Sequence, residues 1–421
     1  MSIRRPRGTN DFLPEETPKW QYLENTIRQI CREYGYGEIR TPIFEYTELF
    51  QRGVGDTTDI VEKEMFTFTT KGEDSYALRP EGTASSVRAY IENKLYAQPQ
   101  PSKVYYVGPM FRYDRPQAGR YRQFHQFGVE VFGTDDPAVD AEVIAMSMDF
   151  YNRLGLKNLA LHINSVGCPT CRAVHREQLL TYLQDKRDQL CPLCTSRIDR
   201  NAMRVLDCKN PSCQEATKGA PTTNTCLCEE CSTHFEQVKR FLEVLQVPYV
   251  VDDRLVRGLD YYTKTAFEIM SQDIGAQSSI GGGGRYNGLT EQIGGAPTPG
   301  IGFALGMERI LLTMERQGVA FPENSPFDVF VATIGEKSVE AAVELLARLR
   351  KAGLAAEKDY LGRSLKAQMK YANKFNGRFT VIIGEDELAK GVVVVRDMSD
   401  SSQEEVDFRQ VDSYLMAKLG K

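Results

Sequence analysis

The sequence predicts an α+β protein in which an antiparallel sheet domain carries a helical insertion and is followed by a separate α/β domain. Short strand-like segments joined by loops dominate the first part of the chain, which indicates antiparallel pairing. Nine of the ten cysteines lie between Cys168 and Cys231, and strand and helix patterns alternate toward the end of the chain. We therefore expect a first domain over 1–325, interrupted by a cysteine-rich helical module at about 165–240, and a second domain over 327–421.

The first predicted element is a long amphipathic helix. Apolar side chains recur at helical spacing over 18–35, namely Trp20, Leu23, Ile27, Ile30 and Tyr34. Gly35 supplies a C-terminal stop. The next segment, 38–44, predicts a strand, and its Pro42 suits an edge position because proline cannot donate a ladder hydrogen bond.

Strand patterns on both sides of the cysteine-rich module complete the predicted sheet. Residues 103–111 and 122–132 predict two strands joined by a loop at 116–119. Beyond the module, strand-like sequence runs from Val250 to Met270, so the module interrupts the sheet without ending it. An apolar strand flanked by glycines then leads into a helix whose apolar face is formed by Met307, Ile310, Leu311 and Met314.

The last part of the chain predicts a compact α/β domain. Its strand patterns lie at 327–333, 379–383 and 392–395. A helix pattern between the first two contains Val339, Ala342, Val343 and Leu346. The residues ahead of this domain have the composition of a linker, namely Pro322, Asn324, Ser325 and Pro326.

Composition sets limits on location and partners. Apolar residues make up 41% and charged residues 26%, as in soluble globular proteins. No apolar run reaches the roughly 18 residues of a membrane-spanning helix, so we expect a cytoplasmic protein without a membrane partner. The net charge of −5 supplies no general attraction for nucleic acid, and any RNA contact must use local basic clusters.

The densest charged segment lies between Phe111 and Glu130. It holds four arginines within eleven residues, at 112, 115, 120 and 122, with aromatic side chains between them. The planar guanidinium fork suits phosphate oxygens, and aromatic rings can stack on bases. A solvated charged hairpin would have the same composition, so this pattern by itself favours neither interpretation.

Further segments have both a chemical and a plain structural interpretation. The segment 257–262 places one arginine before two tyrosines, which fits a cation at a reacting centre or, more simply, an exposed strand end. Gly281–Gly284 allows close approach of a ligand or forms a tight turn. Arg309 should point away from the core face of its helix, where a surface ion pair is the simplest role. Glu81 lies in a proline–glycine turn that would present its carboxylate.

The cysteines have metal-ligand spacing. Pairs separated by two to four residues suit zinc in a reducing compartment, and the spacing that favours one tetrahedral site belongs to Cys191, Cys194, Cys208 and Cys213. Free thiols explain the same spacing equally well. The stretch has no intervening histidine pair and no evident water-activating carboxylate, which argues for a structural rather than a catalytic metal.

Taken together and in order, these segments resemble the class II aminoacyl-tRNA synthetases, and specifically the histidyl-tRNA synthetase family. The helix and strand ending at Pro42 resemble the first, dimer-forming motif, the 111–130 hairpin the second, and 300–312 the third. More specific are Arg257-Gly258-Leu259-Asp260-Tyr261-Tyr262 and Gly282-Gly283-Gly284-Arg285-Tyr286, which resemble two signatures peculiar to this family. The resemblance covers essentially the whole chain.

This resemblance implies a fold and a reaction. It implies a class II antiparallel catalytic domain, a helical insertion that clamps the acceptor end of tRNA, a C-terminal anticodon-binding domain and a homodimer. The implied reaction activates L-histidine with ATP and Mg²⁺ to histidyl-adenylate and pyrophosphate, then transfers histidine to tRNA(His). The cysteines depart from the commonest family pattern, so the expected structural Zn²⁺ rests on their spacing alone.

The resemblance also implies residue roles. Arg112 and Arg257 would be catalytic, gripping the α-phosphate from two sides. The implied histidine site comprises Glu81, Gly82, Thr83, Arg112, Gln126, Glu130, Arg257, Tyr261 and Tyr262. The implied ATP site comprises Arg112, Asp114, Arg120 and Arg309, and the tRNA acceptor end would meet Gln117, Arg120 and Arg122. A local basic run in the last domain would help to bind RNA, namely Lys358, Arg363, Lys366, Lys370 and Lys374.

Two other functions remain open at this point. A non-catalytic paralog, the regulatory subunit of ATP phosphoribosyltransferase, would bind histidine as a signal. The intact Arg257 cluster and the extra domain from 327 onward argue against it. An RNA-binding protein with a zinc module is the more distant alternative.

Overall fold

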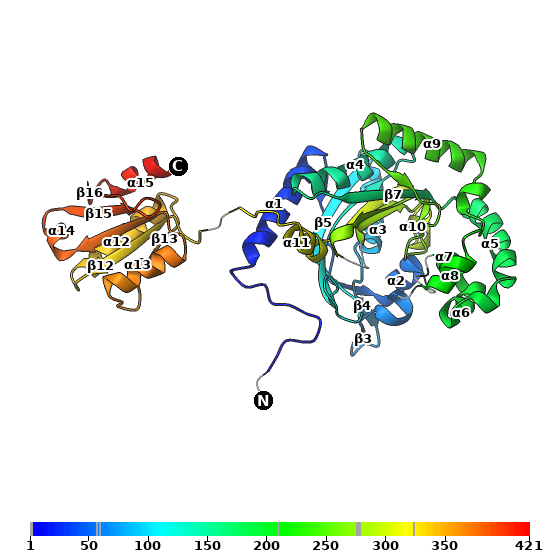
Figure 1. Cartoon of the computed structure of the whole chain (residues 1–421), viewed down its shortest axis with the longest axis horizontal. Coiled ribbons are helices and arrows are strands. Elements are labelled where there is room, and N and C mark those ends of the chain that lie inside the picture. The colour runs from blue at the N-terminus through cyan, green and yellow to red at the C-terminus, as the bar shows by residue number, and fades with distance from the viewer. Residues whose placement is uncertain are drawn as a thin grey trace. The chain divides into compact units, whose positions relative to one another are not determined.

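The computed structural model describes residues 3–55, 58, 60–206, 208, 210–274, 279–322 and 325–421. They form two compact units, Met1–Ala320 and Phe321–Lys421, and each unit is described by itself (Figure 1). The predicted linker residues Pro322 and Ser325 lie outside helices and strands, while Asn324 falls outside the described residues.

An eight-stranded sheet forms the centre of the first unit. Its strands follow the order β1-β5-β6-β11-β10-β9-β7-β8, and the inner pairs are antiparallel, whereas β1 with β5 and β7 with β8 are parallel. This confirms the antiparallel sheet domain expected from the sequence. The strands are β1 Gly37–Glu38, β5 Ser102–Phe111, β6 Gln123–Phe132, β7 Leu159–Ser165, β8 Val250–Val251, β9 Thr263–Ser271, β10 Ser279–Arg285 and β11 Gly300–Gly306.

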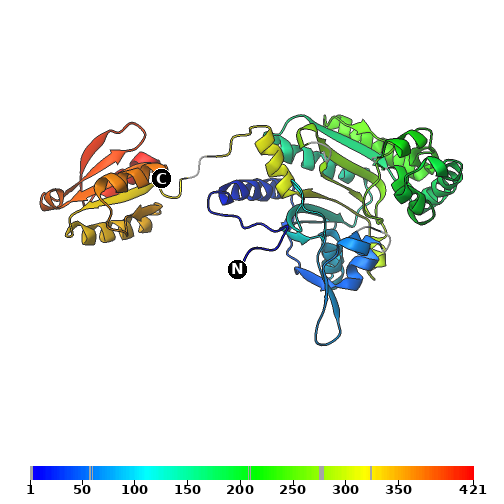
Figure 2. The ribbon, with the colours of Figure 1, turned by 60° about the horizontal axis from the view of Figure 1, so that its bottom comes forward.

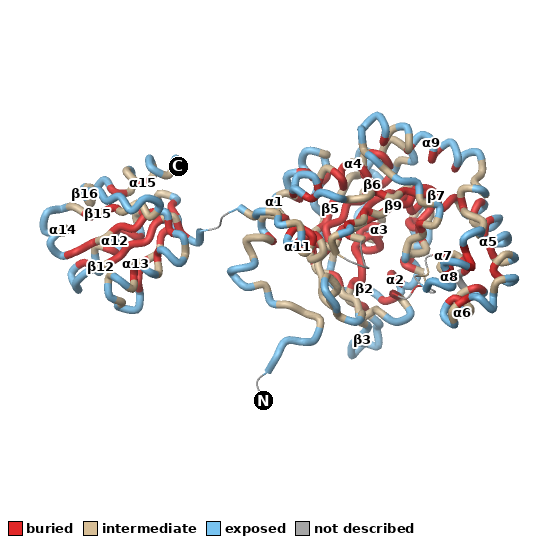
Figure 3. Tube along the Cα trace, viewed as in Figure 1, coloured by how far each residue is buried: buried red, intermediate tan, exposed pale blue. Residues whose placement is uncertain are grey.

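Helices pack around this sheet and against one another. They are α1 Thr17–Glu33, α2 Thr47–Val54, α3 Thr83–Glu92, α4 Pro137–Arg153, α10 Leu289–Gln292 and α11 Met307–Arg316. The predicted first helix is confirmed, because Trp20, Leu23, Ile27 and Ile30 all face the core of the unit. The predicted apolar face of α11 is buried as well. Figure 3 shows the buried residues concentrated along the strands and on the inner faces of these helices.

The single strand predicted over 38–44 is wrong. The chain leaves the large sheet after β1 and enters a second, three-stranded sheet of order β2-β4-β3, made of β2 Phe44–Tyr46, β4 Ser75–Leu78 and β3 Thr67–Thr69. Arg79 binds the link between the two sheets, because its Nη1 donates to the carbonyls of Thr41 at 3.0 Å and Pro42 at 3.3 Å. The β3–β4 hairpin extends away from the rest of the unit (Figure 2).

Two further predictions need correction. Strand structure does not continue from Val250 to Met270, because 252–262 forms turns and loops that carry Arg257 and the two tyrosines. The glycine cluster is no tight turn but lies inside β10, between β9 and β11. A Cβ on Gly283 would stand 2.0 Å from the carbonyl oxygen of Gly302, so the close approach of the two strands requires glycine here.

The cysteine-rich insertion is helical, as predicted. It comprises α5 Pro169–Gln184, α6 Pro192–Asn201, α7 Met203–Leu206, α8 Pro211–Ala216 and α9 Glu229–Val244. Helices α5 to α8 gather at one side of the first unit, and α9 packs along α4 (Figure 1). Leu179, Leu183, Ile198 and Val205 form a small core inside the module, together with Cys194 and Cys213.

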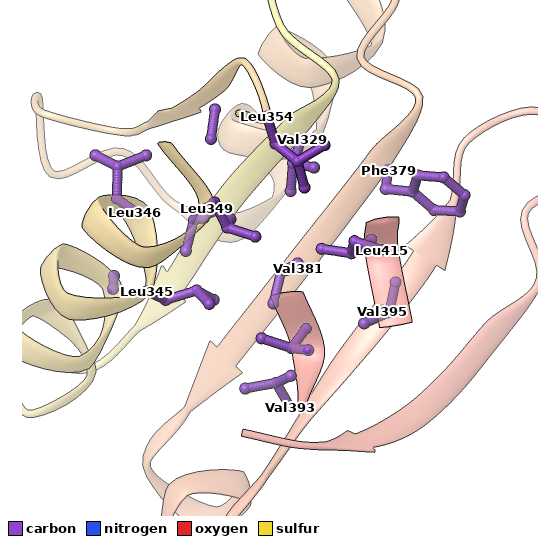
Figure 4. Packing of buried hydrophobic residues seen from close by; sticks show 14 of the residues in the cluster. Val329, Leu345, Leu346, Leu349, Leu354, Phe379, Val381, Val393, Val395 and Leu415 are labelled. Atoms are coloured by element: carbon purple, nitrogen blue, oxygen red, sulfur yellow. The ribbon is translucent and has the colours of Figure 1, made fainter. Parts of the chain in front are cut away.

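The second unit has the predicted α/β character. Its five-stranded sheet has the order β13-β12-β14-β15-β16, made of β12 Val329–Ile334, β13 Ala356–Lys358, β14 Phe379–Gly384, β15 Val392–Asp397 and β16 Gln403–Asp407. Its helices are α12 Ser338–Lys351, α13 Leu365–Lys374, α14 Glu385–Ala389 and α15 Val411–Leu419. Leu345, Leu349, Val381, Val393 and Leu415 belong to the core between helices and sheet (Figure 4).

The described part of the chain contains no helix that combines the length and the apolarity needed to span a membrane.

Candidate active site

One cavity of about 440 Å³ lies in the first unit and collects most of the side chains singled out from the sequence. Its walls come from the 112–126 hairpin, the turn before α3, the 257–262 loop, β10, β11 and the start of α11. The predicted site residues that line it are Glu81, Thr83, Arg112, Asp114, Arg120, Gln126, Arg257, Tyr261, Tyr262 and Arg309. Four other predicted residues do not line it, namely Gly82, Gln117, Arg122 and Glu130.

Three arginines from distant parts of the chain face this cavity. Arg112 directly follows β5, and its Nε donates to the carbonyl of Pro80 at 2.8 Å. Arg309 lies in the first turn of α11, where its Nε donates to the carbonyl of Gly119 at 3.2 Å. Arg257 comes from the loop after the insertion. Three cations around one cavity form a site suited to a polyanion.

Arg257 contacts Glu268 and Tyr262. Its Nη1 donates to Glu268 Oε1 at 3.1 Å, and its guanidinium carbon lies 5.7 Å from the centre of the Tyr262 ring. Its Nε is buried without a hydrogen-bond partner among the described residues. A Cβ on Gly282 would stand 2.9 Å from Nη1, so glycine in β10 gives this side chain its space. An anionic ligand in the cavity would accept a hydrogen bond from this buried, unpaired N–H, and this would favour its binding.

Glu81 presents its carboxylate at the start of α3. Its two oxygens accept the backbone N–H groups of Thr83 at 2.6 Å and Ala84 at 2.8 Å. These bonds favour the anion, yet burial has the larger effect and raises the pKa of Glu81. Gln126, on the facing strand β6, has a buried Oε1 without a partner among the described residues. The two side chains offer acceptors to a cationic group.

Glu130 lies behind the cavity wall and is 1% exposed. Its Oε1 accepts the Thr83 hydroxyl at 2.7 Å, and its Oε2 accepts the Tyr286 hydroxyl at 2.5 Å. Burial raises the pKa of Glu130 to about 8. A Cβ on Gly302 would stand 2.1 Å from Oε2, so the glycine of β11 makes room for this carboxyl group.

An ion pair, two backbone hydrogen bonds and a cation–π contact stabilise the loop between β5 and β6. Arg120 pairs with Asp114 at 3.0 Å, and the backbones of Arg120 and Gln117 exchange two hydrogen bonds at the tip. Arg122 stacks on Tyr113, with the guanidinium carbon 3.8 Å from the ring centre. The arginines of this segment therefore do not form an undifferentiated charged hairpin, since Arg112 and Arg120 line the cavity while Arg122 braces the loop.

Several cavity residues were not singled out from the sequence. Glu308 accepts the backbone N–H of His125 at 2.9 Å and lines the cavity beside Arg309. Tyr286, which was named in a family signature but given no role, lines the cavity, whereas the buried Arg285 before it pairs with Asp140 and does not reach the cavity. Arg204 reaches the cavity from α7 of the insertion, a contact that no local sequence pattern signals.

The predicted zinc ligands come together within the insertion. The Sγ atoms of Cys191, Cys194, Cys208 and Cys213 all lie within 4.8 Å of one another. Cys191 caps α6 and Cys213 lies in α8, and the backbone N–H of Cys191 donates to Cys213 Sγ at 3.1 Å.

Comparison with known families decides the assignment. A family model described as Histidyl-tRNA synthetase matches residues 8–310, which include every element of the cavity. The chain belongs to the histidyl-tRNA synthetase family. A second model, described as an anticodon binding domain, matches residues 328–418 within the second unit.

Full-length relatives agree with this assignment. A histidine–tRNA ligase of Desulforamulus reducens is 65% identical over 418 residues, covering 99% of this chain and 100% of the relative. One of Pelotomaculum thermopropionicum is 64% identical over 419 residues, covering 100% and 99%. The crystal structure of an apo histidyl-tRNA synthetase of S. aureus is similar with a TM-score of 0.84 at 43% identity, covering 98% of this chain and 100% of that one. The similarity therefore spans both units.

Proposed function

We propose that this chain is a histidine–tRNA ligase and that its reaction takes place in the cavity of the first unit. Family membership and the names of its full-length relatives support the reaction. In the first step a carboxylate oxygen of L-histidine attacks the α-phosphorus of ATP, the bond to the β-phosphate breaks, and pyrophosphate leaves. In the second step the terminal ribose hydroxyl of tRNA(His) attacks the histidyl carbonyl carbon, and AMP leaves.

The observation that carries this proposal is the convergence of Arg112, Arg257 and Arg309 on one cavity. Negative charge grows on the α-phosphate oxygens during the first step, and fixed cations stabilise it without reorganising. We assign Arg112 and Arg257 to the α-phosphate, while Arg309 binds the distal phosphates. Asp114 and Arg120 close the nucleotide side of the cavity. Magnesium bound to ATP would neutralise part of the remaining charge of the nucleotide.

The histidine substrate fits beside these arginines. Its ammonium group would meet Glu81, Thr83 and Gln126, whose oxygens line the cavity close to the start of α3. The unpartnered Oε1 of Gln126 supports this placement, since a buried acceptor gains most from a charged donor. Gly82 and Tyr261 complete this side of the site, and Gly82 is confined against the Tyr106 ring.

Glu130 and Tyr262 would pair with the imidazole ring. Tyr262 lines the cavity, and Glu130 reaches the same wall through the Thr83 hydroxyl. A site built to bond both ring nitrogens rejects other side chains, because they would leave its buried polar groups unpaired. Selectivity for histidine then needs no separate editing reaction.

The tRNA would contact both units. The tip of the 112–122 loop, with Gln117, Arg120 and Arg122, is proposed to guide the acceptor end. On the second unit, Lys366, Lys370 and Lys374 are exposed along α13 at four-residue spacing, while Tyr360 is 65% exposed nearby in sequence and can stack on a base. Lys358 is buried, and Arg363 pairs with Asp359, so these two members of the predicted basic run support the fold of the unit instead. We retain 327–421 as the anticodon-binding domain.

We further propose a cytoplasmic homodimer. The three-stranded sheet of the first unit exposes an aromatic face made by Phe44, Tyr46 and Phe68, which are 51%, 58% and 42% exposed. An exposed aromatic cluster of this kind is typical of a protein interface. Phe44 and Tyr46 come shortly after the segment ending at Pro42, which resembles the dimer-forming motif of the family.

A structural zinc ion is proposed for Cys191, Cys194, Cys208 and Cys213. Zinc–sulfur bonds of about 2.3 Å in a tetrahedron set the sulfur atoms about 3.8 Å apart. The 4.8 Å limit on the present separations is close to that arrangement. Four thiolates would fill the coordination shell, so the ion would stabilise the fold of the insertion and take no part in the reaction.

The reaction is tested by histidine-dependent exchange of pyrophosphate into ATP with the purified full-length chain. Exchange should require L-histidine, and Arg257→Ala should lower its rate by about a hundredfold or more while histidine binding changes little. Arg350→Ala, on an exposed position of α12, is the matched control and should exchange at the parent rate. Near-parent exchange by Arg257→Ala would refute the assigned role, and no exchange by the parent chain would favour a histidine-binding regulator.

A further inference from the structure

A second group of four cysteines lies outside the predicted zinc site. The Sγ atoms of Cys168, Cys171, Cys228 and Cys231 all lie within 4.8 Å of one another. Cys168 Sγ stands 3.5 Å from Cys171 Sγ and 4.0 Å from Cys228 Sγ. All four are free thiols, and the two cysteine pairs lie near the starts of α5 and α9, the first and last helices of the insertion.

The N-termini of two helices bring the sulfur atoms of these four cysteines close together. Cys168 and Cys228 cap the N-termini of α5 and α9, and the buried Cys171 and Cys231 lie in the first turns of the same helices. The backbone N–H of Cys228 donates to Cys171 Sγ at 3.1 Å. Two helix starts therefore bring two sulfur atoms each to the same place, where zinc could bind all four.

The arrangement repeats that of the first quartet. In both, a Cys-Pro-x-Cys segment opens a helix, with proline at its first position, as at Pro169 of α5 and Pro192 of α6. In both, two cysteines are half-buried and two are buried, and one cysteine N–H donates to a sulfur of the opposite pair. The same construction occurs twice in one module.

We propose that Cys168, Cys171, Cys228 and Cys231 bind a second structural zinc ion, independent of the one assigned to the first quartet. A tetrahedral zinc with bonds of about 2.3 Å needs sulfur atoms about 3.8 Å apart. The separations of 3.5 Å and 4.0 Å lie on either side of that value. A disulfide would need about 2.0 Å within one pair and would leave one half-buried and one buried thiol of the other pair without a partner.

This ion would fasten the insertion to the catalytic sheet. Cys168 follows Gly167, whose carbonyl accepts the backbone N–H of Lys264 at 3.0 Å in β9. Lys264 also donates through Nζ to Glu230, which lies between Cys228 and Cys231, at 2.8 Å. The first and last helices of the insertion thus begin beside one residue of β9, two positions after Tyr262. None of the four cysteines is among the described residues that line the cavity, so the ion's role is to fix this junction.

The test is the metal content of the full-length chain, purified from cells grown with zinc. Two zinc ions per chain are expected. The double variant Cys168→Ser, Cys228→Ser changes the two half-buried ligands and should retain one, and Cys191→Ser should also retain one. Cys226→Ser should retain both, since Cys226 belongs to neither quartet and donates to Gln178. Unchanged zinc in the double variant, or a parent chain whose only zinc is lost in Cys191→Ser, would overturn the proposal.

A second measurement avoids variants that fail to fold. The metal-free parent chain is titrated with Co²⁺, whose visible absorption is strong in a tetrahedral thiolate site. Absorption should rise until two equivalents are bound, with a sulfur-to-cobalt charge-transfer band of equal size for each. Saturation at one equivalent, or recovery of Cys168 and Cys171 as a disulfide from a chain that holds the first metal, would also overturn it.

Discussion

The carboxylate of Glu308 accepts the backbone N–H of His125, with 2.9 Å between Oε1 and nitrogen, and the same oxygen lies 3.0 Å from His125 Nδ1. This contact joins the first turn of α11 to β6. Arg309 and Gln126 are the next residues along the two segments, and both face the cavity. The pair therefore fixes the proposed distal-phosphate cation relative to the proposed ammonium acceptor.

Replacing Glu308 with alanine should weaken ATP use. The half-buried N–H of His125 would lose its acceptor, which costs about 1 kcal/mol of unfolding free energy. We expect the KM for ATP in pyrophosphate exchange to rise several-fold, because Arg309 loses its fixed position. Glu308→Gln keeps one acceptor and should lie between alanine and parent. His125→Ala keeps the backbone N–H but removes the ring, which also packs against Phe12 and Trp20. A rise in the KM for ATP as large in His125→Ala as in Glu308→Ala would refute the backbone role.

Glu130 should make stability depend on pH. Its pKa is about 8 in the folded chain against an ordinary 4.5, so between these values the folded state keeps a proton that the unfolded state releases. The stability that this proton contributes is complete below about pH 4.5, falls as pH rises, and is lost above about pH 8. Glu130→Gln cannot titrate and should show a shallower decline. Urea unfolding of both chains at pH 5, 6, 7 and 8 measures the two slopes, and identical slopes would contradict the shift.

Gly302→Ala should destabilise the fold and displace Glu130 from its present position. The added Cβ would stand 2.1 Å from Glu130 Oε2 and 2.2 Å from the carbonyl oxygen of Val129, and the backbone atom cannot move aside cheaply. Overpacking of this kind costs about 1–3 kcal/mol of unfolding free energy. Calorimetric titration with histidine should show at least tenfold weaker binding. Gly37→Ala, whose Cβ would find only Lys103 O at 4.0 Å, should change neither quantity.

Elements with a strong local pattern were predictable from the sequence. The period of apolar residues gave α1 and α11, and alternation bounded by turn residues gave β5 and β6. The errors arose where distant contacts override local preference. The segment at Pro42 changes sheets because Arg79 binds its carbonyls, and the glycine cluster stays extended because Gly302 approaches it closely.

The candidate site shows the same division. Residues inside recognisable motifs, such as Arg112 and Arg257, could be singled out from the sequence. Both line the same cavity in the structure. Arg204 could not be singled out from the sequence, because only the packing of the insertion brings it to the cavity. The second cysteine quartet was missed for a related reason, because its two pairs open the first and the last helix of the module and become neighbours only when α5 and α9 are in place.

The exposed aromatic face of the three-stranded sheet predicts the oligomeric state. Phe44→Glu would place a charge among Phe68, Tyr76 and the facing copy, where burial without a partner is unfavourable. The parent chain should have the mass of a dimer by light scattering after size exclusion, and this variant should shift toward monomer. Val244→Glu changes a residue of α9 that is 72% exposed and is the matched control. A monomeric parent, or a Phe44→Glu chain that stays dimeric, contradicts the interface.

Charge reversal on α13 should impair tRNA use without affecting amino-acid activation. Lys366 and Lys370 are exposed on one side of this helix, in the unit matched by the anticodon-binding family model. Each lysine that contacts a phosphate releases a counterion on binding, so Lys370→Glu should raise the KM for tRNA(His) and reduce the salt dependence of binding by about one counterion. Pyrophosphate exchange should stay at the parent rate, because that step uses only the cavity of the first unit.

Lys351→Glu changes an exposed lysine at the end of α12 and is the matched control. It makes the same change of charge and should leave the KM for tRNA(His) near the parent value. Equal effects of the two reversals would mean that net charge governs the interaction and that α13 is not the contact surface.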